Sequence, residues 1–454
     1  MSICVNLSRE VLLTIAKMLI DFTVANFRSI KGTVTLSTVA QSHANLRSDQ
    51  GAAKRRKNVT PDNQIASTIP IEGRSLELLP VLGIFGANAS GKSNVLLALD
   101  ELLGFIYLGA DSEGTNNFRN LSTPFRLSKD TLTDPTSYEL RVVRERVIYT
   151  YSLEVDRTKV LKERLDYIPR ISKRMQSRLL YSRIWNEAEK SYEIKNGSDF
   201  GNTYKEIQQS LRPHEPFMSI LAQRIKVKVV VPFTDWLSAL WPGVTLGWED
   251  ADHRLATTLA TTWPAMKEQV TSLICMFDTG INDFEIVKSQ PETQKKAKGD
   301  DDSFHVSVTH HTKDGEVVWL LDDESTGTQR LFSLAYKMLD AFRNGLLVLV
   351  DELGANIHPN ITRTIVRMFQ SKKINPHGAQ LIFTSHDNTL QRGNLLRRDQ
   401  IWFTQKMPDA STHLYPLTDF HPRNDLALDK AYLDGRFGAV PVLPEEENLY
   451  RLIE

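Results

Sequence analysis

A glycine-rich segment near residue 90 carries residue types that bind phosphate. Its residues are Gly86, Ala87, Asn88, Ala89, Ser90, Gly91, Lys92, Ser93 and Asn94. The apolar run Leu79–Phe85 before it predicts a strand, and the spacing of Asn94–Tyr107 after it predicts a helix. Between a strand and a helix, the pattern G-x4-G-K-[ST] wraps backbone N–H groups around nucleotide phosphates, which also meet the positive end of the helix dipole. We therefore expect residues 86–94 to bind ATP, with Lys92 reaching the β and γ phosphates and Ser93 binding Mg2+.

Two apolar runs in the last third of the chain end in candidate catalytic residues. Leu346–Val350 predicts a strand buried on both faces, and Asp351 and Glu352 follow it. Charges at that place lie at the carboxyl edge of a parallel sheet, where α/β proteins bind ligands. Asp351 is predicted to hold Mg2+, and Glu352 to orient and deprotonate the attacking water. A second strand leads to His386, which is predicted to donate a hydrogen bond to the γ-phosphate. The predicted catalytic residues are Lys92, Glu352 and His386.

Composition and charge describe an ordinary soluble protein. The chain has 454 residues, of which 41% are hydrophobic and 24% charged, so one large or two ordinary domains are expected. Lys+Arg and Asp+Glu both number 55, so the net charge gives no overall attraction to nucleic acid. Two cysteines, Cys4 and Cys275, provide neither a disulfide framework nor a metal site, which favours the reducing cytoplasm. No apolar run approaches the roughly 20 residues of a membrane span, so no membrane partner is expected.

The nucleotide-binding elements lie at both ends of the chain. The predicted strands there are Leu19–Asn26, Val34–Val39, Leu79–Phe85, Leu346–Val350, Gln380–Thr384 and Gln400–Thr404, and the later helices are Gly327–Phe342 and Asn360–Ser371. Alternation of helices and strands predicts an α/β fold with a split nucleotide-binding domain. The predicted boundaries are an N-terminal extension at 1–17, an ATPase N-terminal lobe at 18–120, an insertion at 121–320 and an ATPase C-terminal lobe at 321–454.

The insertion is expected to contain a β segment followed by a helical region. Its predicted strands are Tyr138–Val143, Val147–Val155, Val306–Thr309 and Val317–Leu321, its predicted helices are Lys162–Gln176 and Asp235–Phe277, and its predicted core tryptophans are Trp236, Trp241, Trp248 and Trp263. The arginines from Arg164 to Arg183 are spaced like the solvated face of a helix, and a contact with DNA or a partner is the alternative. His310 and His311 are expected in an exposed loop, without a third metal ligand nearby.

Two polar segments are interpreted from composition alone. Gln290–Asp302 has the composition of a mobile loop. The basic run Lys54–Lys57 is interpreted as part of a solvated loop, with a nucleic-acid contact as the alternative.

The segment Asp323–Arg330 resembles the signature motif of ATP-binding-cassette (ABC) ATPases. Ser325 and Gly327 match that motif, whereas Glu324, Thr326 and Thr328 replace its common leucine, glycine and glutamine. The resemblance implies that Ser325 and Gly327 bind, in trans, the ATP held by another subunit. Independently of it, Ser325 is expected to cap the N-terminus of the following helix.

The segment Asn26-Phe27-Arg28-Ser29 resembles the opening of SMC and RecF-type ATPases. That resemblance implies that Arg28 reaches the nucleotide; the alternative is a surface arginine beside a core phenylalanine. A closer resemblance is to prokaryotic ATPases of abortive-infection and anti-phage systems, including RloA-like proteins and the ATPase subunit of the PARIS system. It covers Leu19–Ser37, Leu79–Tyr107, Glu324–Phe403 and Tyr432–Pro441. Gly354-Ala355-Asn356 departs from the serine-containing D-loop of the superfamily.

These resemblances imply an ATP-driven switch. Two copies would sandwich two ATP molecules head-to-tail, as a dimer or a higher homo-oligomer. The chain after His386 carries no acidic cluster of a nuclease, so a nuclease effector would have to be a separate chain. The family resemblance implies that this effector is a TOPRIM-type nuclease and that the trigger is derived from a phage. The alternative is a RecF-like DNA-maintenance ATPase that binds DNA directly, against which the zero net charge and the lack of a long heptad run count. The Asp351-Glu352 pair counts against a purely structural scaffold.

Overall fold

The computed structural model describes residues 17–41, 67–71, 74–109, 116–169, 176–240, 266–288, 304–393, 395–423, 425–442 and 444. Residues 1–16, the basic run Lys54–Lys57 and the segment Gln290–Asp302 lie outside the described residues, as do Trp241, Trp248 and Trp263.

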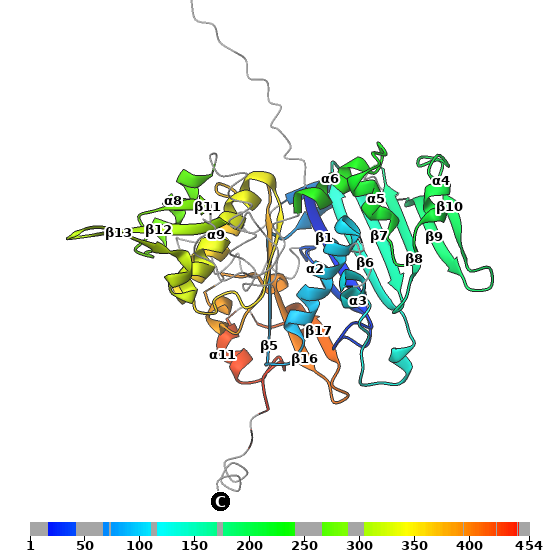
Figure 1. The fold of residues 1–454 in the computed structure, drawn as a ribbon. Helices are drawn as coiled ribbons and strands as arrows, with labels where there is room; N and C mark the ends of the chain where they lie inside the picture. Colours follow the sequence, from blue (N-terminus) through cyan, green and yellow to red (C-terminus); the bar gives the residue numbers. More distant parts are fainter. Residues whose placement is uncertain are drawn as a thin grey trace, which may run out of the picture.

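A five-stranded sheet joins the two ends of the chain (Figure 1). Its order is β14 (Leu347–Val350), β15 (Gln380–Thr384), β5 (Val81–Gly86), β16 (Ile401–Lys406) and β17 (Thr412–Pro416). The first four strands are parallel and β17 is antiparallel to β16. Because β5 pairs on both sides with strands from the end of the chain, the nucleotide-binding domain is split, and the predicted α/β fold is confirmed.

The strands of this sheet are buried because their sequences are apolar. Every residue of β5, β14 and β15 is buried. Strands covered on both faces require apolar side chains at each position. The polar residues that follow β14 and β15 therefore emerge together at one edge of the sheet, since the two strands are parallel and adjacent.

A seven-stranded antiparallel sheet contains the N-terminal strands and the first part of the insertion. Its order is β10 (Ser191–Asn196), β9 (Arg178–Asn186), β8 (Val160–Ile168), β7 (Val147–Val155), β6 (Thr136–Arg144), β1 (Lys17–Ala25) and β2 (Val34–Ser37). Gln380 links this sheet to the five-stranded one. Its buried side chain accepts a hydrogen bond from Leu19 N (2.7 Å) and donates to the carbonyls of Leu19 and Leu79.

Helices pack beside these sheets (Figure 1). The helix α2 (Lys92–Leu108) packs on β5 and β15 and against α3 (Asn116–Leu121), α5 (Phe217–Gln223) and α6 (Val231–Leu240). The C-terminal lobe adds α9 (Thr326–Asn344), α10 (Pro359–Gln370) and α11 (Leu428–Leu433), and α4 (Lys205–Ser210) packs on β10. No described helix is long and apolar enough to cross a membrane.

A small third sheet precedes α9. It consists of β11 (Asp283–Lys288), β12 (Phe304–Thr312) and β13 (Gly315–Leu320), with α8 (Lys267–Met276) packed on α9. Phe284 of β11 contacts Phe332 of α9 edge-to-face, with 4.6 Å between ring centroids. The hairpin of β12 and β13 projects from one side of the molecule (Figure 1). A separate hairpin is formed by β3 (Ser67–Ile71) and β4 (Arg74–Leu78).

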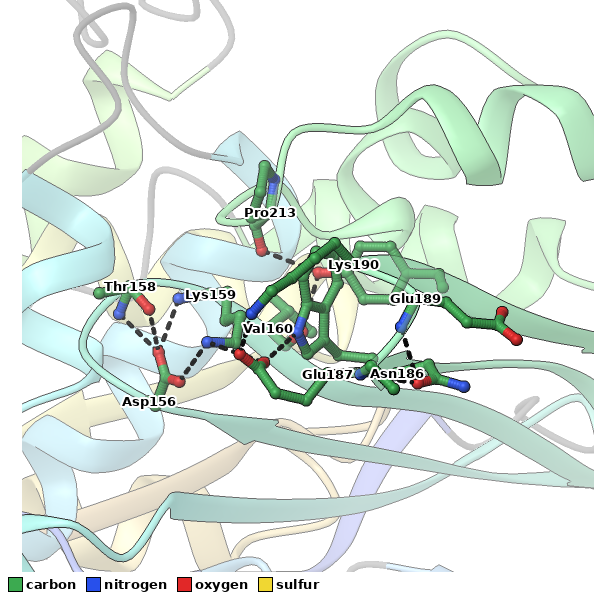
Figure 2. Close-up of polar contacts among 12 residues, drawn as sticks. Asp156, Thr158, Lys159, Val160, Asn186, Glu187, Glu189, Lys190 and Pro213 are labelled. Carbon is green, nitrogen blue, oxygen red and sulfur yellow. Dashed lines mark hydrogen bonds and ion pairs between the residues drawn. The ribbon is translucent and has the colours of Figure 1, made fainter.

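The turn between β7 and β8 is held by local polar contacts (Figure 2). Asp156 Oδ1 accepts hydrogen bonds from the backbone N–H groups of Thr158 (2.6 Å) and Lys159 (2.8 Å). Lys159 Nζ lies 3.1 Å from Asp156 Oδ2 and 3.7 Å from Glu187 Oε2. Surface ion pairs of this kind contribute about 0–1 kcal/mol each to the free energy of unfolding. They therefore fix the conformation of the turn and add little to the stability of the sheet.

Some predictions for the insertion are wrong. Residues 162–168 of the predicted helix Lys162–Gln176 belong to β8, which pairs with β7 and β9. Arg164 and Arg183 consequently lie on strands, and Arg183 is fully buried. His310 and His311 lie within β12 rather than in a loop. The spacing of charged residues misled the prediction because strand pairing, a long-range contact, overrides local periodicity.

Other predictions for the insertion are confirmed. The strands near 138–155 and 304–320 form as antiparallel pairs. Trp236 is buried in the core. The predicted helical region is present as α6 and α8 at its two ends, and residues 241–265 between them are outside the described part of the chain.

Candidate functional site

The phosphate loop, residues 86–93, connects β5 to α2 as the sequence predicts. Gly91 adopts a left-handed conformation (φ 100°), and a Cβ there would lie 1.9 Å from Thr412 Oγ1. Only glycine fits both conditions. Asn88 and Ala89 are exposed, whereas Ser90 and Lys92 are buried. The loop thus presents its tip and the N-terminus of a 17-residue helix to solvent, which suits the binding of an anion.

Hydroxyl groups from distant elements support this loop. Ser90 Oγ lies 2.6 Å from Thr404 Oγ1, and Thr412 Oγ1 donates to Ser90 O at 3.0 Å. Ser29 Oγ lies 2.8 Å from Thr412 Oγ1 and accepts from Asn94 Nδ2 at 2.7 Å. Thr404 and Thr412 could not be singled out from the sequence, because threonine is common in strands and carries no local signal.

Lys92 lies directly over the loop. Its Nζ donates to the carbonyl oxygens of Gly86 and Ala87, both at 2.9 Å. Burial lowers the pKa of Lys92, and the nearby carboxylates of Asp351 and Glu352 oppose that shift. The ammonium group is therefore placed between the phosphate loop and the two acidic residues predicted to act with it.

Asp351 and Ser93 meet although 258 positions separate them in sequence. Ser93 Oγ donates to Asp351 Oδ1 at 3.1 Å, and Thr384 Oγ1 donates to the same oxygen at 2.6 Å. A hydroxyl and a carboxylate oxygen are ligands that Mg2+ prefers, usually together with water and substrate phosphates. The pair Ser93 and Asp351 thus fits the Mg2+ position expected from the sequence.

The backbone of Glu352 is held in an unusual conformation. Its φ is 54°, in the left-handed region, which costs about 1–3 kcal/mol for such a residue. Thr384 Oγ1 accepts from Glu352 N and Thr384 O from Leu353 N, both at 2.8 Å, while Ser385 Oγ donates to Leu353 O at 2.8 Å. These bonds maintain the strained backbone and leave the Glu352 side chain exposed. Thr384 and Ser385 were not singled out from the sequence.

His386 follows β15 and is exposed at the same edge of the sheet. Burial lowers the pKa of its imidazole and Lys92 adds to the effect, while Glu352 and Asp351 oppose it. The imidazole of His386 is therefore close enough to Lys92, Asp351 and Glu352 for their charges to affect it. A lowered pKa keeps the ring neutral near pH 7, with one N–H available to donate.

Ser325 and Gly327 lie at the N-terminus of α9. Ser325 caps this helix as predicted, because its Oγ accepts from Thr328 N at 3.2 Å. A Cβ on Gly327 would lie 2.3 Å from Asn356 O, so the helix start packs closely on residues 354–356. Arg330 Nη1 donates to Ala355 O at 2.8 Å and strengthens the contact. Ser325 itself is exposed.

Arg28 lies one residue before Ser29, which contacts Asn94. Its backbone N–H donates to Thr123 O at 2.9 Å. Burial raises the pKa of Glu101, and the guanidinium of Arg28 opposes that shift. Glu101 is about two and a half turns along α2 from Lys92. The binding of a nucleotide by Arg28 stays a prediction.

The fold and this arrangement define a P-loop nucleotide-binding domain of the split α/β type. The chain belongs to the family described as "AAA domain, putative AbiEii toxin, Type IV TA system", whose model matches residues 81–211 and 274–391, more than half of the chain. The expected relation to abortive-infection ATPases is confirmed at this level. No curated protein matches the sequence.

Several solved structures of Smc head domains are similar to this chain. One, bound to the C-winged helix domain of ScpA, is 14% identical, with a TM-score of 0.40 over 91% of this chain and 99% of that chain. A second, from Pyrococcus furiosus with an extended coiled coil and the C-terminal domain of ScpA, is 11% identical, with a TM-score of 0.38 over 93% and 99%. A third, from Pyrococcus yayanosii with a coiled coil and joint, is 10% identical, with a TM-score of 0.43 over 93% and 99%.

Proposed function

We propose that this protein hydrolyses ATP with Mg2+ at the edge of the five-stranded sheet. The observation that carries the proposal is the contact of Ser93 Oγ with Asp351 Oδ1 at 3.1 Å, beside the exposed side chains of Glu352 and His386. A phosphate loop, a Mg2+ position and a candidate base thus lie within one cluster.

Each residue has a separate role in this proposal. The backbone N–H groups of the phosphate loop and Lys92 bind the phosphates. Ser93 and Asp351 hold Mg2+, which neutralises charge on the phosphate oxygens. Glu352 accepts a proton from water, and neutral His386 donates a hydrogen bond to the terminal phosphate.

We further propose that the complete site needs a second copy of the chain. Glu352, His386 and the phosphate-loop tip are exposed in one chain, and so is Ser325 at the start of α9. Ser325 and Gly327 of one copy would cover the nucleotide of the other and exclude bulk water, leaving the single attacking water beside Glu352. ATP then acts as the ligand of a two-state switch, favouring the closed dimer until it is hydrolysed.

The biological role that we propose is control of a separate effector in an anti-phage system in the cytoplasm. The description of the matched family names a putative AbiEii toxin and a type IV toxin–antitoxin system, which supports this assignment. The sequence resemblance to abortive-infection ATPases supports a TOPRIM-type nuclease as the effector and a phage product as the trigger.

The enzymatic part is tested by measuring phosphate release from ATP with purified protein, with and without Mg2+. We expect turnover that requires Mg2+, is lost in Lys92→Ala and Glu352→Gln, and rises per subunit with protein concentration. Nucleotide binding without any turnover in the wild type, at any concentration, would overturn the proposal.

The biological part is tested by purifying the tagged protein after expression from its native locus. Wild type and Glu352→Gln are compared, with ATP present. A co-purifying nuclease whose retention differs between the two supports the proposed role. A protein that recovers no partner and binds DNA as an ATP-dependent dimer is instead a DNA-maintenance ATPase.

A further inference from the structure

A partly buried cluster joins the third sheet to the signature turn, residues 324–327. Glu324 Oε1 lies 2.7 Å from His310 Nε2 of β12 and accepts from Trp319 Nε1 of β13 at 2.8 Å. The rings of His310 and Trp319 are stacked, with centroids 4.2 Å apart and planes 19° from parallel. The side chains of His310 and Glu324 are only 14% and 10% exposed. Three residues from three elements therefore form one unit.

The chemistry of the cluster fixes its hydrogen bonds. The indole N–H of Trp319 is a donor only, so Glu324 Oε1 must accept there. An ionised Glu324 must also accept from His310, which places a proton on His310 Nε2. Hydrogen bonds to an ionised carboxylate are about twice as strong as neutral ones. The leucine that is common at this position in ABC signatures could form neither bond.

The same turn is held from its other side. Gln329 Nε2 donates to Glu324 O at 2.9 Å, and Gly327 packs against Asn356 O. Residues 354–356 begin two positions after Glu352, and Ala355 N donates to Glu352 O at 2.9 Å. The signature turn is therefore fixed between the third sheet and the segment that carries the candidate base.

We propose that Glu324 is a positioning residue for ATP bound in trans. By anchoring the signature turn to His310 and Trp319, it sets the orientation in which Ser325 and Gly327 meet the nucleotide of the second copy. This inference rests on the proposed ATP-bridged dimer. The anchoring role accounts for a glutamate at the position where leucine is common in ABC signatures. It also connects the third sheet to the catalytic site through the signature turn.

Glu324→Leu and Trp319→Phe test the role of the cluster. The first removes both hydrogen bonds, and the second removes one donor while keeping a ring against His310. We expect turnover at saturating ATP to fall about ten- to a hundredfold in Glu324→Leu and by less in Trp319→Phe, because a displacement of about 1 Å can cost that much. The affinity of dilute, monomeric protein for a fluorescent ATP analogue should not change, since the phosphate loop is intact. Glu324→Gln, which retains one acceptor oxygen, should recover part of the rate.

His311→Ala is the matched control. His311 is the next residue on β12 and pairs with Glu316 at 3.2 Å, but the two side chains are 58% and 70% exposed. Its turnover should equal that of the wild type.

Mixing experiments separate a defect in the signature half-site from a general loss of structure. Glu324→Leu mixed with Lys92→Ala should regain activity, because each chain supplies the half that the other lacks. Glu324→Leu mixed with Ser325→Arg should not, because both chains lack the same half. Normal turnover of Glu324→Leu and Trp319→Phe, or lost affinity for the analogue, overturns the inference alone. A wild type without turnover overturns the proposed function itself.

Discussion

Two glutamates of this chain end up in opposite situations. Glu352 lies just beyond β14, with an exposed side chain and a strained backbone (φ 54°). Glu163 lies inside the seven-stranded sheet, fully buried beside Arg183, with 2.8 Å between Glu163 Oε2 and Arg183 Nε. Both are charged side chains on strands or strand ends, so residue type does not distinguish them. Their positions relative to the two sheets distinguish them.

The buried glutamate has all its partners within the protein. Its donors are the Tyr151 and Tyr181 hydroxyls, Arg183 Nε and the backbone N–H groups of Phe217 and Met218. The last two open α5, which packs on α2. Glu163 therefore attaches a helix to the insertion sheet. In the part of the chain that the structure describes, Glu352 is fixed by hydrogen bonds of its backbone, and its exposed carboxylate faces solvent, where a ligand can reach it. A charged side chain thus stabilises the fold where groups of the protein satisfy it, and is available for chemistry where only its backbone is fixed.

The largest expected effect is on turnover. Glu352→Gln should lower the rate of ATP hydrolysis by about 10²–10⁴-fold, because a general base contributes that much. Its free energy of unfolding should stay within about 0.5 kcal/mol of the wild type, as for other exposed side chains. Steady-state phosphate release and urea titration measure the two quantities. Equal turnover in variant and wild type would show that another group activates the water.

The reverse pattern is expected for Glu163→Gln. An amide cannot satisfy all the donors around Oε1 and Oε2, and Arg183 is left buried without its counter-ion, at a cost of about 3–5 kcal/mol. Urea unfolding monitored by circular dichroism measures the loss. The double variant Glu163→Gln/Arg183→Met should be less unstable than the sum of the single changes, since the two residues interact. A stability equal to that of the wild type would remove the contrast between the two glutamates.

Thr384→Val tests whether the Thr384 hydroxyl positions Asp351 and Glu352 at the edge of the five-stranded sheet. Valine has the shape of threonine but lacks the hydroxyl that bonds both Asp351 Oδ1 and Glu352 N. We expect turnover to fall about tenfold and the free energy of unfolding to fall by about 1–2 kcal/mol. Thr384→Ser keeps the hydroxyl and should restore most of the turnover. Turnover of the valine variant equal to that of the serine variant would rule out this positioning role.

A pH-dependent effect is expected for Asp100, a half-buried carboxyl of α2 outside both clusters. Burial, assisted by Glu101 and opposed by Lys337, raises the pKa of Asp100 to about 7. The unfolded carboxyl ionises near pH 4, so the stability that Asp100 contributes is lost as the pH rises from about 4 to about 7. Asp100→Asn cannot ionise, so its free energy of unfolding relative to the wild type should rise by about 2–3 kcal/mol between pH 5 and pH 7.5. Urea titrations of both proteins at both pH values measure this change. A stability difference between variant and wild type that is the same at both pH values would contradict the raised pKa of Asp100.

The sequence predicts the parts of the site that depend on local pattern. The phosphate loop, the strand before Asp351 and the strand before His386 each combine an apolar run with a short motif, and the expected strands and helix form there. The α/β fold follows from the same alternation. Local patterns suffice at these places because a parallel sheet brings its strand ends to one edge.

The supporting residues could not be predicted because their partners are far away in sequence. Thr404 reaches Ser90 across 314 positions, and Thr412 reaches Ser90 across 322. The position of Arg183 depends on the pairing of β8 with β9, where helix-like spacing suggested an exposed face. No local pattern distinguishes a threonine or an arginine of this kind from any other on a strand.

The central claim is that the catalytic site is completed by a second copy of the chain. It is tested most directly by mixing Lys92→Ala, which retains the signature turn, with Ser325→Arg, which retains the phosphate loop and Glu352. Each variant alone should be nearly inactive. A 1:1 mixture should recover about a quarter of the wild-type rate per subunit, because half of the random dimers are mixed and each has one complete site. No recovery in the mixture, together with a wild-type rate per subunit that is independent of concentration, would show that a single chain carries the whole site.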